Sequence, residues 1–336
     1  MRLSTSLQKG ILQTSVGNVL NRFIARSRRD TLFFEDILAS YIAECEKCGY
    51  GEDIRKITER WSELLFCRLV PISLKRFPLP ILTEIAKKNW NVLGMIDDLS
   101  IEKNDDMILI KTKNESITRI IGKNEFMLGF FKGNVNAVYD SQSEVAHVKQ
   151  GKGSSEYHFE LTNEPIFVLG RDKSLYDRLN YMKPLEGFTL NDAFKKGMLQ
   201  LKDRNEIYFR EKRITITENT IFHLIGNSDL PLDGLPSISF SFFSKVIMKE
   251  STDGQKLILL KNLLQVMGWG IVNISFGEKN RVTIGIKNPP YGLQLEKDNW
   301  QFLNKMILGY LWLLDEEFLI KDTQESHKDI IMTYMR

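Results

Sequence analysis

The stretch FMLGFFKGNVNAVY, residues Phe126–Tyr139, decides the fold because a second version of it follows later in the chain. That second version is FLNKMILGYLWLL, residues Phe302–Leu314, at an offset of 176 positions. At this offset Gly309 matches Gly133. A fixed offset between two related stretches indicates an internal repeat. We therefore expect two copies of one structural unit.

The similarity continues upstream of both stretches. The tripeptide Glu102–Asn104 recurs as Glu278–Asn280, and the same offset of 176 relates the apolar residues that follow. These matches pair Ile108, Ile110 and Lys111 with Ile284, Ile286 and Lys287. Further upstream, Thr31–Phe33 resembles Thr220–Phe222 at a larger offset. The predicted organisation is a first repeat over residues 1–169, a linker over 170–196 and a second, degenerate repeat over 197–336.

Apolar periodicity predicts the elements of each repeat. Helical spacing of apolar residues predicts helices over 34–45, 53–69 and 82–91, and over the two organising stretches. Alternation in Val282–Ile286 predicts a half-buried strand, and residues 144–148 and 156–161 read as a hairpin around Gly151 and Gly153. We expect no such hairpin in the second half, because Lys321–Lys328 is polar and unpatterned. The expected fold class is α/β (α+β): two tandem repeats, each with several helices packed on a small, mainly antiparallel sheet.

The composition is that of an ordinary globular protein. The chain has 336 residues, 43% of them hydrophobic and 26% charged, and a net charge of +3. Such a small net charge makes nucleic acid an unlikely partner. Three cysteines argue against a disulfide framework and for a reducing, cytoplasmic location. No apolar run approaches the roughly 20 residues that a transmembrane helix needs.

The order of elements and three motifs resemble the 4-vinyl reductase domain family, whose fold is similar to that of the small TRAPP subunits. The motifs are FMLGFFKG at 126–133, EVAH at 144–147 and YHF at 157–159. Residues 30–161 carry most of the resemblance, and residues 197–320 match weakly. The resemblance implies tandem hydrocarbon-binding-like modules, with an apolar interior that admits a hydrophobic small molecule. It also implies pairing through helices, so a protein partner or a homodimer is expected.

Three functions follow as expectations. The first is a non-catalytic module that binds or senses a hydrophobic ligand. The second is a structural adaptor or scaffold that pairs through helices. The third is an accessory factor or enzyme acting on a pigment-like or lipid-like substrate. We favour a non-enzymatic role because phosphate-binding, dinucleotide-binding and nucleophile-elbow motifs are absent from the sequence.

The expected ligand-binding residues lie around the first organising stretch: Trp90, Phe126, Gly129, Phe130 and Gly133. The aromatic side chains supply apolar surface, and the two glycines lack a side chain to hold a neighbour off. Both features also suit plain packing of the core. The role of the glycines is therefore open between helix packing and ligand clearance.

The resemblance implies a zinc ion held by a glutamate and cysteines in the final hairpin of some family members. Glu144 stands at the glutamate position, but His147 replaces the following cysteine. With His158 these residues form a candidate metal set, since imidazole and carboxylate suit zinc. Along the strand, however, His158 shares a face with Glu156 and Glu160, which also fits a solvated surface.

Cys45 and Cys48 form a C-x-x-C pair. A structural zinc needs four ligands, and the sequence offers only one further thiol, Cys67. Cys45 lies on the apolar stripe of a predicted helix, where free cysteine behaves as a small buried hydrophobe. We therefore expect both thiols to be packed, with a metal or redox role as the alternative.

Overall fold

The computed structural model describes residues 12–15, 27–69, 75, 77–166, 188–202, 206–247, 251–277, 281–290, 292, 297–326 and 329–336. Within them the first half contains β1 Leu12–Ser15, β2 Ser27–Phe34, α2 Glu35–Lys47, α3 Gly51–Leu69, α5 Leu79–Val92, β3 Asp98–Asn104, β4 Met107–Lys113, α6 Thr118–Ile121, α7 Glu125–Tyr139, β5 Ser141–Gln150 and β6 Ser154–Pro165. The second half contains α9 Leu190–Lys195, β7 Gln200–Leu201, β8 Ile207–Phe209, β9 Lys212–Glu218, α10 Thr220–Gly226, α11 Leu235–Val246, α12 Asp253–Val266, β10 Ile271–Gly277, β11 Arg281–Lys287, α13 Gln301–Leu311, β12 Leu319–Glu325 and β13 Asp329–Met335.

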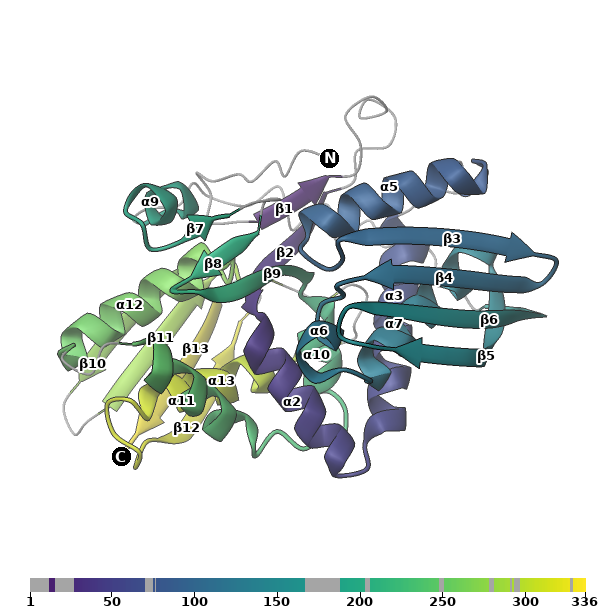
Figure 1. Cartoon of the computed structure of the whole chain (residues 1–336). Helices are drawn as coiled ribbons and strands as arrows, with labels where there is room; N and C mark the ends of the chain where they lie inside the picture. The colour runs from purple at the N-terminus through teal and green to yellow at the C-terminus, as the bar shows by residue number, and fades with distance from the viewer. Residues whose placement is uncertain are drawn as a thin grey trace.

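Three antiparallel sheets organise these elements, and the α+β class with repeated helix-on-sheet units is confirmed. The two four-stranded sheets have the same strand order, β3-β4-β6-β5 in the first half and β10-β11-β13-β12 in the second. A five-stranded sheet, β1-β2-β9-β8-β7, joins the halves because β2 pairs with β9. Figure 1 shows the two four-stranded sheets on opposite sides of the molecule. The repeats thus share a central sheet.

The organising stretch is the helix α7, as predicted. Asn124 caps the N-terminus of this helix: its Oδ1 accepts a 2.9 Å hydrogen bond from the Met127 N–H. The helix ends at Asp140, which adopts φ 54°. The second stretch forms α13 at the equivalent place beside its own sheet. Both helices are almost entirely buried, which agrees with their high apolar content.

The second hairpin corrects one expectation from the sequence. Residues 319–325 and 329–335 form β12 and β13, so the second half does have the hairpin. The inward alternation lies on β13, in Ile330, Met332 and Tyr334. β12 is an edge strand with six of its seven residues exposed, and edge strands need no apolar alternation. The polar sequence over Lys321–Lys328 therefore concealed a strand.

Two other alignments were wrong. Thr31–Phe33 lies in a strand, whereas Thr220–Phe222 begins a helix, so these segments are not equivalent. In the strands the repeat spacing is 174 positions, not 176. Lys113 and Lys287 mark this spacing, since each ends a strand and is followed by an asparagine at φ 51°. A shift of two residues keeps the same side chains on the buried face, which is why the sequence could not reveal it.

The helix α11 begins at Leu235 with a proline in its first turn, where proline is tolerated. Residues 170–187 of the predicted linker, and Glu278–Asn280, lie outside the described residues. Among the helices that are described, none has the length and hydropathy to cross a lipid bilayer.

A buried cluster of charged side chains connects the two halves. Glu35, 2% exposed, accepts a 2.6 Å hydrogen bond from the Arg119 guanidinium and a 3.1 Å bond from the Ile117 N–H. Arg213 of the second half also faces it at 4.0 Å. Aromatic packing adds to this junction, with the Phe33 and Phe222 rings 4.6 Å apart. The two halves therefore share a continuous core.

Candidate functional site

The aromatic residues predicted to bind a ligand are brought together in the first half. Trp90 projects from α5 and Phe130 from α7, with ring centroids 5.4 Å apart. Phe126 lies nearby, 6.0 Å from Trp61 of α3. All of these side chains are at most 5% exposed. The rings contact one another as a filled core, and a ligand-binding role for them stays a prediction.

Gly129 and Gly133 face the backbone of α3. A Cβ atom at Gly129 would overlap the Arg55 carbonyl oxygen, and one at Gly133 would lie 2.8 Å from the Ser62 Cβ. Gly309 repeats this relationship against α11, where a Cβ would lie 2.7 Å from the Ser239 Cβ. The glycines allow two helices to approach closely, and the space beside them is occupied by a helix.

The three candidate metal ligands lie on the hairpin β5–β6 but do not converge. The rings of His147 and His158 are cross-strand neighbours, 5.3 Å apart, while Glu144 stands opposite Glu160. His158 Nε2 lies 2.6 Å from a Glu156 oxygen, and this hydrogen bond is the main cause of the lowered pKa of Glu156. Within the described part of the chain, no three His, Cys, Asp or Glu side chains cluster closely enough to hold a metal ion. Zinc therefore stays a prediction from the resemblance.

The two thiols of the C-x-x-C pair have different environments. Cys45 is 1% exposed on α2, and burial raises the pKa of its thiol to about 11. Cys48, at the end of that helix, is exposed. The expected packing is thus right for Cys45 and wrong for Cys48, while the Cys67 side chain lies outside the described residues.

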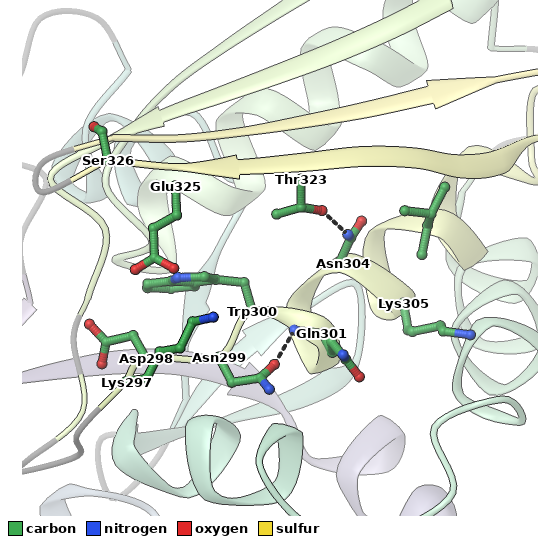
Figure 2. Close-up of a pocket in the computed structure, with 11 residues that line it drawn as sticks. Lys297, Asp298, Asn299, Trp300, Gln301, Asn304, Lys305, Thr323, Glu325 and Ser326 are labelled. Carbon is green, nitrogen blue, oxygen red and sulfur yellow. Dashed lines mark hydrogen bonds between the residues drawn. The ribbon is translucent and has the colours of Figure 1, made fainter.

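A polar cleft of about 1010 Å³ lies in the second half, between the start of α13 and β12. Figure 2 shows the residues that line it, which are mostly polar: Lys297, Asp298, Asn299, Trp300, Gln301, Asn304, Lys305, Ile320, Thr323, Glu325 and Ser326. Sequence reasoning missed this site. Such a volume is at the upper end of the roughly 300–1,000 Å³ typical of small-molecule sites.

His223 of α10 packs against Trp300 in the wall of the cleft. The two rings meet edge to face at 4.6 Å, and His223 is 1% exposed. The imidazole contacts the backbone on both sides of the ring. Nε2 lies 3.1 Å from the Pro290 carbonyl oxygen, and Nδ1 lies 2.8 Å from the Asn299 carbonyl oxygen and 3.0 Å from the Asn299 nitrogen. This arrangement fixes the segment immediately before α13.

The indole N–H of Trp300 is buried and has no hydrogen-bond partner among the described residues. In Figure 2 the Glu325 carboxylate of β12 points toward this indole. Deeper along α13, the Asn304 amide donates to Thr323 Oγ1 at 2.7 Å and completes a polar wall. An unpaired buried donor costs roughly 1–3 kcal/mol, and a ligand oxygen that accepts from it would offset part of this cost.

The position equivalent to this cleft in the first half is closed by side-chain hydrogen bonds. Gln150 and Glu325 are equivalent, because each directly precedes a hairpin turn. In both turns the N–H of the next residue, Gly151 or Ser326, donates to the carbonyl three residues later. Asn124 and Trp300 are equivalent as the residues that precede α7 and α13. Gln150 accepts from the Asn124 N–H and donates to the Asn124 carbonyl, both at 2.9 Å. Glu325 makes no corresponding bond with any described residue, which leaves the second place open.

The polar wall is also specific to the second half. Equivalent positions in the repeats are apolar in the first and polar in the second: Leu128 and Asn304, Val148 and Thr323, Phe159 and Tyr334. The Tyr334 hydroxyl accordingly bonds the Asn304 side chain. A comparison of the two hairpins would have exposed these substitutions, but the second hairpin was not recognised from the sequence.

Comparison with known proteins adds no identification. No model of a known protein family matches this chain, and no curated protein is similar enough in sequence to count as a relative.

Proposed function

We propose that this chain is a small-molecule binding module whose site is the polar cleft between α13 and β12. The observation that carries this proposal is the unpartnered, buried indole N–H of Trp300 in the wall of a cleft large enough for a ligand. The proposal keeps the class of function predicted from the sequence. It moves the site from the first repeat to the second and changes the ligand from apolar to polar.

Two features support the change of site. In the first repeat, α3 fills the space beside Gly129 and Gly133, and the equivalent of the cleft is sealed by Gln150. In the second repeat, the wall residues Asn304 and Thr323 are polar where the first repeat is apolar. Polar side chains in a cleft orient a ligand through hydrogen bonds, so their presence in only one repeat favours binding there.

Indole NMR tests the proposal. The chain has five tryptophans, and each indole N–H gives one resonance, which Trp300→Phe assigns to Trp300 by its disappearance. We expect members of a library of water-soluble polar compounds, at millimolar concentration, to shift the Trp300 resonance. The matched control is Trp312, whose Nε1 donates to the Phe318 carbonyl at 3.0 Å and should not move. A library that shifts no Trp300 resonance would overturn the proposal.

A further inference from the structure

We infer that the cleft takes a neutral, polyhydroxylated compound of the sugar class. This inference rests on the proposed binding function and adds the chemistry of the ligand to it. It follows from the charge of the cleft, from the burial of its uncharged groups and from the mixture of donors and acceptors that it presents.

The formal charges of the lining residues cancel. Lys297 and Lys305 are balanced by Asp298 and Glu325. Lys305 is also bound to Asp233 at 2.8 Å, and that hydrogen bond lowers the pKa of Asp233. With Asp233 included the cleft has one net negative charge, so it has no excess of positive charge with which to attract phosphate or carboxylate groups.

The most buried residues of the lining, Trp300 and Asn304, are uncharged and each 5% exposed. Lys297 and Glu325 are exposed at the rim, and the one mostly buried charge is the Asp298 carboxylate, whose side chain is 15% exposed and 3.8 Å from His223. An anionic group placed against Trp300 and Asn304 would lose its hydration without gaining a buried counter-charge, which is costly. A neutral ligand group avoids this cost. Anions and zwitterions are disfavoured for the same reason.

The groups that remain available include both donors and acceptors. Trp300 Nε1 can only donate, the Glu325 carboxylate can only accept, and the Gln301 amide can do both. None of the three side chains makes a hydrogen bond to another described residue. The hydroxyl is the neutral group that answers each of them, because it donates one hydrogen bond and accepts two. Several hydroxyls on one scaffold would engage them together.

An apolar ligand fits the lining poorly. Ile320 is its only aliphatic residue and Trp300 its only aromatic one among the described residues. Since the hydrophobic gain is proportional to the apolar area removed from water, this surface offers little to a hydrocarbon chain. The Trp300 indole N–H adds a buried polar donor to this wall.

Calorimetric titration with four sets of probes separates the possible outcomes. The sets are neutral saccharides and polyols (hexoses, pentoses, N-acetylhexosamines, disaccharides and inositol), anions (inorganic phosphate and citrate), zwitterions (glycine and lysine) and an apolar acid (decanoate). We expect binding from the neutral set alone. Trp300→Phe keeps an aromatic ring but removes the N–H, so affinity should fall at least tenfold. Glu325→Gln should weaken binding about fivefold, and exposed Glu317→Gln should leave it unchanged.

The outcomes distinguish this inference from the proposed function. Binding of anions, zwitterions or decanoate alone, with the Trp300 indole resonance shifted, overturns the sugar class and leaves the cleft as the site. Saccharide binding that survives both Trp300→Phe and Glu325→Gln places the sugar elsewhere and overturns the inference. No binding from any set, with no shift of the Trp300 resonance, overturns the inference and the proposed function together. Should Trp300→Phe unfold, Glu325→Gln decides, since Glu325 is exposed and makes no described bond.

Discussion

Gln150 bonds both the N–H and the carbonyl of Asn124 at 2.9 Å, and thereby ties the end of β5 to the start of α7. Its counterpart Glu325 makes no such hydrogen bonds to the backbone at the start of α13. One pair of equivalent positions therefore closes one repeat and leaves the other open. The asymmetry has direct consequences for stability.

Alanine at these two positions should have unequal effects. Gln150→Ala removes the two bonds to Asn124 and a 3.0 Å bond to the Tyr157 hydroxyl, which predicts a loss of about 2–3 kcal/mol in unfolding free energy. Glu325→Ala removes no described bond and should change stability by less than about 0.5 kcal/mol. Urea unfolding of both variants measures the difference. Equal losses would contradict the view that only the first repeat is sealed.

Substitution of alanine for two helical glycines should change the unfolding free energy in opposite directions. At Gly309 the new Cβ would overlap the Pro236 carbonyl of α11, so Gly309→Ala should destabilise by about 1–3 kcal/mol through overpacking. Gly254 in α12 is exposed, with nothing within 4 Å of an added Cβ. Gly254→Ala should therefore stabilise by about 0.5–1 kcal/mol through lower backbone entropy of the unfolded chain. Denaturant midpoints test this, and a stabilising Gly309→Ala would refute close helix packing there.

Stability should fall with rising pH because of Glu115. This carboxyl is 1% exposed, and burial raises its pKa above the ordinary value of 4.5, although Thr112 and Tyr157 donate to it. The folded state then binds more protons than the unfolded state, so unfolding free energy decreases as pH rises from about 4.5 through the raised pKa. One such group contributes a slope of at most about 1.4 kcal/mol per pH unit.

The neutral isostere isolates this contribution. In Glu115→Gln the slope should be smaller, and the stability of the variant relative to the parent should increase with pH. Urea unfolding across pH 4.5–8 measures both curves. Other carboxyls with a raised pKa, such as the partly buried Glu46 and Glu63, titrate in both proteins and cancel in the difference. A difference that is constant with pH would show that Glu115 does not titrate as described.

The C-x-x-C thiols should react at different rates in the folded protein. Cys48 is exposed and should be alkylated by iodoacetamide within minutes at pH 8. Cys45 is buried with a thiol pKa of about 11, so only a small fraction is thiolate and the reaction should be slower by more than about a hundredfold. Peptide mass mapping reads both sites separately. Comparable rates would mean that α2 opens readily or that Cys45 is not packed as described.

Elements with a strong local pattern could be predicted from the sequence. Helices α2, α7 and α13 carry apolar stripes because each packs along the core, and the first hairpin shows its alternation in Tyr157 and Phe159. β12 could not be predicted in this way, since an edge strand has no buried face to mark in its sequence. The pairing of β2 with β9, which joins the two halves, also leaves no local pattern.

By itself, the sequence determined that the chain is a tandem repeat with two glycine-bearing central helices, because periodicity and repetition are local properties. Only the tertiary structure decided that the position before the first central helix is closed and that a cleft lies open before the second. That difference depends on whether a side chain at a strand end reaches the backbone before a helix. Gln150 reaches Asn124, 26 residues away in the chain, while Glu325 forms no such bond beside Trp300. Contacts of this kind follow from distance and direction in space, which composition and spacing do not contain.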